Sequence, residues 1–147
     1  MKTFKHIVVP TDFEKASAHA LEVATSLALS CGAKLTLLHV WELPVYPYMD
    51  FMLNSEIITR VEDAAVKHLA DALEKLRQVM PDAESKLKTG QPGPSILEAV
   101  LDLKADLVVM GTHGRRGVGR AMLGSVAEKL VRLSTVPVLT VHAPLES

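Results

Sequence analysis

The residues best suited to bind a ligand lie in a glycine-rich stretch, residues 111–125. Apolar residues 107–110 before it predict a buried strand, and the apolar spacing of residues 126–133 after it predicts a helix. A loop between two such elements presents free backbone N–H groups and the positive end of the helix dipole, and both favour phosphate. Glycine omits the Cβ atom that would obstruct a ligand and permits positive φ angles. The stretch contains Gly111, Gly114, Gly117, Gly119 and Gly124.

The same stretch is basic in a chain that is almost neutral. Sixteen Lys and Arg residues against 17 Asp and Glu give a net charge of −1, so no overall field attracts nucleic acid or an anionic membrane. Between Asp106 and Glu128 there is no carboxylate, whereas three arginines are present, Arg115, Arg116 and Arg120. Arginine suits phosphate, but it equally suits a solvated surface, and both interpretations stay open.

Length and composition indicate one compact domain, residues 1–147. A chain of this size with 48% hydrophobic residues buries a core without disulfides. Its one cysteine, Cys31, has no internal partner, and neither a signal-like leader nor a long apolar span is evident. We therefore expect a cytoplasmic protein without a membrane partner.

Strand and helix patterns alternate along the chain. The expected strands are residues 7–9, 35–40, 85–89, 107–110 and 136–141, and the expected helices are residues 21–31, 55–80, 95–103 and 126–133. This alternation predicts right-handed βαβ units, hence an α/β fold with one doubly wound, five-stranded parallel sheet in the order 3-2-1-4-5, Rossmann-like or flavodoxin-like, with helices on both faces. Strands one and four then meet at the switch point, which places Pro10, Thr11 and Asp12 opposite the glycine-rich stretch.

Two common phosphate-binding loops are excluded. A Walker A loop needs a lysine before its final Ser or Thr, and Leu123-Gly124-Ser125 lacks it. The dinucleotide fingerprint requires glycines after the first strand, where this chain has Pro10-Thr11-Asp12-Phe13.

The glycine spacing matches a different pattern: Gly, two residues, Gly, nine residues, Gly and then Ser or Thr. Gly111, Gly114, Gly124 and Ser125 fit it without a gap, and the first strand with Pro10-Thr11-Asp12 agrees. The chain thereby resembles the universal stress protein family, in its ATP-binding branch, over essentially its whole length. The resemblance implies a dimeric α/β domain that binds ATP, together with Mg²⁺, and serves stress tolerance or regulation.

The resemblance also implies roles for individual residues. Pro10, Thr11 and Asp12 would hold the adenosine, Val40 would offer its backbone to the base, and Met110 and Gly111 would line the ribose. The phosphates would lie on Gly114, Gly124, Ser125 and Val126. His113 and Arg115 are further candidates for nucleotide binding, and only the chemistry of their side chains supports them.

Structural alternatives accompany these assignments. Ser125 with Glu128, and Thr11 with Glu14, have the spacing of capping boxes, so each pair could merely begin a helix. His113 equally suits a solvated loop, and the six histidines show no recognisable metal-ligand spacing, so no protein metal site is expected.

Three functions remain open. The first is an ATP-binding regulatory module, and the second is a slow ATPase or phosphoryl-transfer enzyme. The second needs a base and a metal ligand near the γ-phosphate, yet residues 107–127 contain no Asp or Glu, which leaves Asp12. The third is a nucleotide-free dimeric scaffold. We favour binding with at most weak hydrolysis and assign no catalytic residue.

Two segments predict protein contacts. Residues 136–141 form an apolar strand at the edge of the sheet, and pairing with the same strand of a second copy would satisfy its free backbone groups. Residues 41–53 hold two prolines and no basic residue, which indicates a structured loop that covers the crevice or meets a partner protein, not nucleic acid. Its aromatic residues are Trp41, Tyr46, Tyr48 and Phe51.

Overall fold

The computed structural model describes residues 3–42, 55–113 and 123–143 of the chain. Five parallel strands form one sheet in the order β3-β2-β1-β4-β5, which confirms the predicted α/β fold and strand order. The strands are β1 (His6–Pro10), β2 (Lys34–Trp41), β3 (Glu84–Thr89), β4 (Leu107–Gly111) and β5 (Val138–Val141). The helices are α1 (Lys15–Cys31), α2 (Ser55–Arg77), α3 (Pro92–Asp102) and α4 (Ser125–Leu133).

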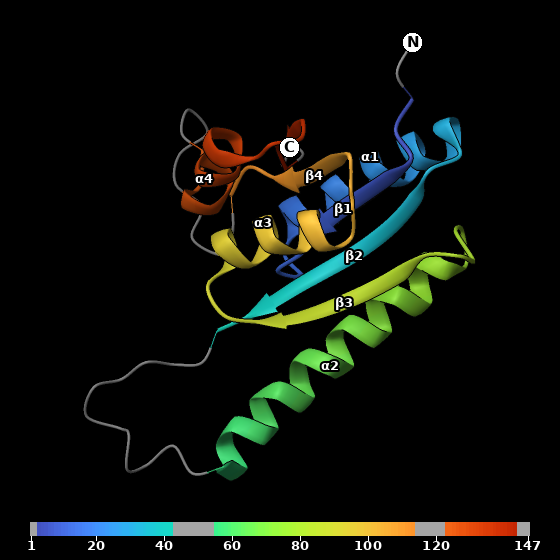
Figure 1. The fold of residues 1–147 in the computed structure, drawn as a ribbon. Helices are drawn as coiled ribbons and strands as arrows, with labels where there is room; N and C mark the ends of the chain where they lie inside the picture. The colour runs from blue at the N-terminus through green and yellow to red at the C-terminus, as the bar shows by residue number, and fades with distance from the viewer. Residues whose placement is uncertain (1–2, 43–54, 114–122, 144–147) are drawn as a thin grey trace.

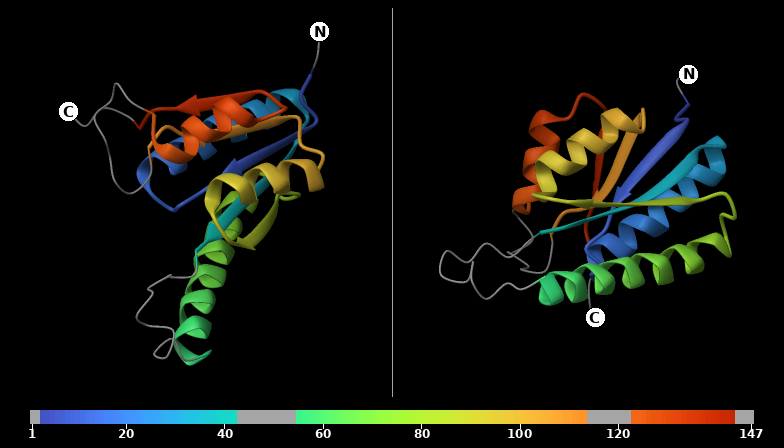
Figure 2. Two further views of the ribbon diagram at one scale, coloured as in Figure 1. Left: turned by 60° about the vertical axis from the view of Figure 1, so that its left-hand side comes forward. Right: turned by 60° about the horizontal axis from the view of Figure 1, so that its bottom comes forward.

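Helices cover both faces of the sheet (Figure 1, Figure 2). α1 and α2 pack on one face, and α3 and α4 pack on the other. The strands alternate accordingly: on β1, Val9 belongs to the core under α1 and α2, whereas Val8 belongs to the core under α3 and α4. Both side chains are fully buried, as expected for a parallel sheet covered on both faces. Among the described residues, none of the helices combines the length and apolar character needed to cross a membrane.

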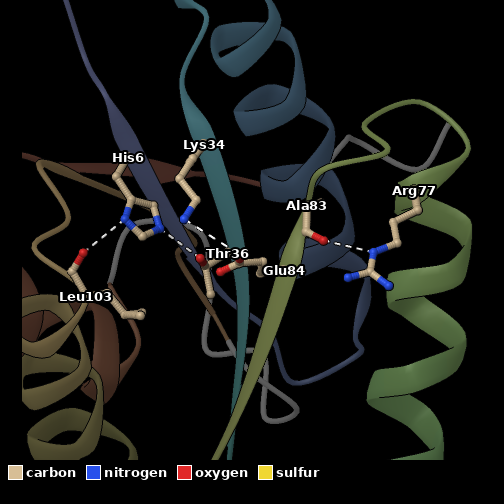
Figure 3. A network of polar contacts seen from close by, with 7 residues as sticks. All are labelled: His6, Lys34, Thr36, Arg77, Ala83, Glu84 and Leu103. Carbon is tan, nitrogen blue, oxygen red and sulfur yellow. Dashed lines mark hydrogen bonds and ion pairs between the residues drawn. The ribbon is translucent and has the colours of Figure 1, made fainter.

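Polar contacts join the elements at the amino ends of the strands, the edge opposite the predicted crevice (Figure 3). His6 Nδ1–H donates to the carbonyl oxygen of Leu103 over 3.0 Å. A neutral His6 ring therefore accepts at Nε2, where the hydroxyl of buried Thr36 lies 2.7 Å away. One side chain thus links β1, β2 and the end of α3.

The helix predicted for residues 55–80 is shorter than expected. α2 ends at Arg77, because Pro81 disfavours helical geometry in the residue before it. Arg77 Nε donates to the carbonyl oxygen of Ala83 over 2.9 Å and so connects the helix end to the segment before β3 (Figure 3). At its other end α2 runs past the sheet (Figure 1), and Val61 in this part of the helix is 40% exposed.

Two boundaries of neighbouring elements also differ from the prediction. α3 begins at Pro92 instead of Ser95, since proline is pre-organised for the first turn, where no backbone donor is needed. Trp41, which we assigned to a loop, is the last residue of β2, and its carbonyl oxygen accepts the N–H of Gly90 over 3.0 Å. The rest of the predicted loop, residues 43–53, lies outside the described residues.

The last strand is shorter than predicted. β5 begins at Val138 rather than at Val136, because Ser134 forms a turn there: its hydroxyl accepts the N–H of Val136 over 3.2 Å and lies 2.8 Å from the carbonyl oxygen of the same residue. The strand lies at one edge of the sheet, as predicted.

Candidate functional site

A cavity of about 930 Å³ lies at the carboxyl ends of the strands, near the top of the usual range for ligand pockets, about 300–1,000 Å³. The cavity lies at the switch point of the sheet, where β1 and β4 are neighbours. Doubly wound sheets bind their ligands at this place. Ten of the predicted site residues line it together: Pro10, Thr11, Asp12, Val40, Met110, Gly111, His113, Gly124, Ser125 and Val126. The other two, Gly114 and Arg115, lie outside the described residues.

Asp12 is held in place by a chain of hydrogen bonds. The N–H of Phe13 donates to Thr11 Oγ1 over 3.0 Å, and the Thr11 hydroxyl donates to Ser17 Oγ over 3.1 Å. The Ser17 hydroxyl then donates to Asp12 Oδ1 over 2.8 Å, and the N–H of Glu14 donates to the same oxygen over 3.0 Å. Both bonds reach Oδ1, and no described residue bonds Oδ2. The second carboxylate oxygen is therefore the one available to a ligand.

Thr11 and Glu14 do not form the capping box that the sequence offered as an alternative. α1 begins after Glu14, and no side chain caps its first turn. Thr11 Oγ1 instead accepts the N–H of Phe13, which has the positive φ of 65° that side chains rarely adopt. The turn between β1 and α1 is thus shaped around Asp12, and local strain of this kind concentrates at functional sites.

Gly111 has a packing role that the sequence did not reveal. A Cβ atom at this position would lie 2.8 Å from Ala16 Cβ and 3.0 Å from the backbone nitrogen of Ser17. The end of β4 therefore touches the first turn of α1 directly. Positive φ, which we expected the loop glycines to use, occurs at neither Gly111 nor Gly124; among the described glycines it occurs at Gly32 and Gly90.

The amino end of α4 offers backbone donors to the cavity. Gly124 is the residue before the first turn, with φ −63° and ψ 161°, and its own N–H donates to the carbonyl oxygen of Thr112 over 2.6 Å. The helical ladder starts at Glu128, whose N–H donates to the Gly124 carbonyl oxygen over 2.9 Å. The first-turn N–H groups of residues 125–127 consequently have no partner within the helix and are free for an anion.

Ser125 does not cap this helix. It is the first helical residue rather than the residue before it, and no side-chain hydrogen bond caps α4. The capping-box alternative for Ser125 and Glu128 is therefore wrong, and the serine hydroxyl remains at the cavity wall.

Thr112 joins the cavity wall to the edge strand. Its side chain is buried, and its Oγ1 lies 3.1 Å from His113 Nδ1 and 3.2 Å from His142 Nδ1. Its N–H donates to the Val141 carbonyl oxygen over 3.0 Å. His113 Nε2 is buried and has no hydrogen-bond partner within the described part of the chain, so this atom can serve a bound ligand.

The ionisable residues in the described lining of the cavity are two carboxylates, Asp12 and Glu42, and three histidines. The described residues contain no group of three or more potential metal-ligating side chains. A clear pKa shift occurs away from the cavity, at Glu98, where the hydrogen bond and charge of Lys88 lower the pKa of the carboxyl below its usual 4.5. The cavity is therefore suited to binding through backbone donors and one fixed carboxylate.

Sequence reasoning missed several residues that build this site. Ser17 orients Asp12, and Thr112 fixes the start of α4. The Phe13 and His39 rings are in contact, with centroids 4.5 Å apart and planes tilted by 47°. Neither Ser17, which precedes the predicted helix 21–31, nor Thr112, in the glycine-rich stretch, carries a sequence signal for such a role. Their importance arises from contacts between segments that only the fold brings together.

These features define a doubly wound α/β domain with its ligand cavity at the switch point. Comparison with known proteins agrees: the model of the universal stress protein family matches residues 3–142. A universal stress protein of Thermus aquaticus is 36% identical over 139 residues, which cover 95% of this chain and 99% of that protein. The chain belongs to the universal stress protein family.

Two solved structures show the same architecture. The universal stress protein UspA from Lactobacillus plantarum superposes with a TM-score of 0.82 at 24% identity, covering 96% of this chain and 99% of the other. A universal stress protein solved in complex with cAMP superposes with a TM-score of 0.70 at 25% identity, covering 97% of this chain and all of the other, 100%.

Proposed function

We propose that this chain binds an adenine nucleotide, ATP with Mg²⁺, in the cavity and acts in the cytoplasm as a nucleotide-dependent regulatory or stress-tolerance module. The observation that carries the proposal is the pairing of a fixed carboxylate with free helix donors. Asp12, two residues after the end of β1, and residues 125–127, whose N–H groups have no partner within α4, line the same cavity. A hydroxyl-rich sugar and a phosphate chain need these two kinds of group.

The proposed contacts follow from the positions of the elements. Asp12 accepts hydrogen bonds from the ribose or base, and the backbone of Val40, on β2, meets the base. Met110 and Gly111 line the ribose, while Gly124, Ser125 and Val126 receive the phosphates. Gly114 and Arg115 belong to the same proposal through the glycine pattern alone.

Magnesium fits the proposal as a companion of the phosphates. Mg²⁺ is commonly held by substrate phosphates, water and one or two carboxylates, and Asp12 is a carboxylate in the lining of the same cavity. When bound, the ion would neutralise phosphate charge. A second carboxylate to serve as a general base is absent from residues 107–127, so we propose binding with at most weak hydrolysis.

Relatives support the nucleotide assignment. The family member solved with cAMP shares 25% identity with this chain and aligns over nearly its full length. Cyclic AMP and ATP share adenine, ribose and phosphate, the three groups for which the cavity has matching donors and acceptors.

Titration calorimetry with ATP and Mg²⁺ tests the proposal. Gly124→Val should abolish binding because the added side chain enters the proposed phosphate path. The backbone angles of Gly124, φ −63° and ψ 161°, are accessible to valine, so the variant should keep its fold. Ala70→Val, on an exposed position of α2 away from the cavity, is the matched control. Unchanged ATP affinity in Gly124→Val would show that the assigned phosphate site is wrong.

We also propose a homodimer formed through β5. The strand is at the edge of the sheet, and one of its sides faces away from β4. Leu139 on this strand is exposed. Antiparallel pairing with the same strand of a second copy about a two-fold axis would satisfy both sets of backbone groups.

A further inference from the structure

We propose that the cavity contains a second binding lobe, on the face of the sheet covered by α1 and α2. This lobe binds a neutral, planar aromatic ring that carries a hydrogen-bond acceptor and a donor, such as an aromatic carboxamide. The inference goes beyond the nucleotide assignment and does not depend on it. We call this region the aromatic lobe. Its described lining residues are Phe13, His39, Trp41, Val61, Ala65 and His68.

Strand alternation separates the aromatic lobe from the proposed phosphate site. Along β2, Leu38 and Val40 pack into the core under α3 and α4. His39 and Trp41 alternate with them and so face α1 and α2, where Phe13 also packs. Gly124 and Ser125 lie on the opposite face, at the start of α4. The cavity therefore wraps around the carboxyl end of the sheet, with different chemistry on its two sides.

The walls of the aromatic lobe combine ring and aliphatic side chains. The Phe13 ring lies 4.5 Å from the His39 ring, centroid to centroid, and meets the His68 ring edge to face at 5.5 Å. Val61 and Ala65, one helical turn apart on α2, add aliphatic surface. Ring faces and edges of this kind favour a planar ring as the occupant.

Two polar groups give the occupant its chemistry. Trp41 is only 7% exposed, and its Nε1–H is buried with no hydrogen-bond partner among the described residues. A buried donor without a partner is costly, so an acceptor on the ligand is favoured there. His39 donates from Nδ1 to the Thr11 carbonyl oxygen over 2.7 Å, so its neutral ring keeps a lone pair on Nε2 and can accept.

The two carboxylates next in sequence to Phe13 and Trp41 favour a neutral occupant of the aromatic lobe over a carboxylate. Asp12 and Glu42 are the carboxylates among the described lining residues, and no lysine or arginine is found in that set. A carboxamide supplies an acceptor for Trp41 and a donor for His39 without a net charge. A carboxylate of the same shape supplies acceptors only.

Trp41 is the single tryptophan of the chain, so its indole N–H gives one unambiguous nitrogen-15 NMR signal. We would titrate the full-length protein, without nucleotide, with benzamide and separately with benzoate at pH 7. The expected result is a saturable shift of the indole signal with benzamide and weaker binding of benzoate by at least severalfold. An indole signal that does not move, or that moves equally with both probes, would overturn the proposal.

Two variants of α2 localise the effect. Val61→Glu places a carboxylate in the wall of the aromatic lobe and should abolish the benzamide shift. Val66→Glu adds the same charge to the same helix at a residue outside the cavity lining, 49% exposed against 40% for Val61, and should leave the shift unchanged. A benzamide shift that survives in Val61→Glu would rule out this lobe as the binding site.

Gly124→Val separates this proposal from the nucleotide proposal. Benzamide carries no phosphate, so its binding should persist in this variant whether or not ATP binds the parent protein. Loss of the benzamide shift in Gly124→Val would contradict a separate aromatic lobe.

Discussion

The Ser17 hydroxyl donates a hydrogen bond of 2.8 Å to Asp12 Oδ1, across the turn that joins β1 to α1. Ser17 is only 6% exposed, and both residues belong to the cavity lining. A hydrogen bond to a charged group is stronger than one between neutral groups, so this contact fixes one carboxylate oxygen and leaves the other toward the ligand. Ser17 is therefore a positioning residue for the proposed nucleotide site.

Ser17→Ala should weaken ATP binding while the protein stays folded. The variant removes one hydrogen bond to a carboxylate, which contributes about 1.5–3 kcal/mol where it is fully expressed, and we expect about a tenfold rise in Kd. Ser26→Ala, on the exposed side of the same helix, should not change the affinity. Calorimetry on both variants, with circular dichroism to confirm folding, makes the comparison. Equal affinities in the two variants would remove Ser17 from the site.

Asp12→Asn distinguishes binding from catalysis. The amide keeps the shape of the side chain but loses its charge, so we expect weaker ATP binding with little change in the turnover of bound ATP. That turnover should lie far below the ~1–10³ s⁻¹ typical of enzymes, because residues 107–127, which include the proposed phosphate site, contain no carboxylate to serve as a base or a metal ligand. Single-turnover assays with saturating protein measure the rate of bound nucleotide. A high rate in the parent that disappears in Asp12→Asn at unchanged affinity would instead establish an ATPase.

Gly111→Ala should destabilise the fold. The new methyl group would lie 2.8 Å from Ala16 Cβ and 2.9 Å from the Ala16 backbone carbonyl carbon, and overpacking of this kind costs about 1–3 kcal/mol. Urea denaturation followed by circular dichroism gives the free energy of unfolding. Adding Ala16→Gly should recover part of the loss, because it removes one of the two clashing partners. A Gly111→Ala protein as stable as the parent would show that β4 and α1 can separate without cost.

The strand order and the place of the cavity could be predicted because they depend on patterns along the chain. Apolar runs such as residues 107–110 indicated buried strands, and the switch point placed Asp12 opposite Ser125. The residues that hold the site residues in place could not be predicted, because their role depends on contacts between distant segments. Gly111 illustrates this: we assigned it to ligand access, whereas its nearest neighbours across the chain are atoms of α1.

Element ends were predicted less well than element identities, for local reasons. Prolines have opposite effects at two sites: Pro92 begins α3, three residues before the predicted start at residue 95, whereas α2 ends four residues before Pro81. The hydroxyl of Ser134 delays β5 by engaging the backbone of Val136. Such competition between a side chain and the sheet is decided by geometry that the residue types alone do not specify.

Dimer formation through β5 predicts different outcomes at adjacent residues. Val138 packs into the core under α3 and α4, whereas Leu139 is 39% exposed. Val138→Lys should therefore disrupt the dimer and lower the free energy of unfolding, and Leu139→Asp should disrupt the dimer with a smaller loss of stability. A charge in the centre of a paired edge opposes association, because the two-fold axis brings it close to its own copy. Leu101→Asp, at a position on α3 that is 66% exposed, controls for added surface charge. Light scattering at micromolar concentration measures the mass: a monomeric parent, or a Leu139→Asp variant that stays dimeric, would exclude β5 as the interface.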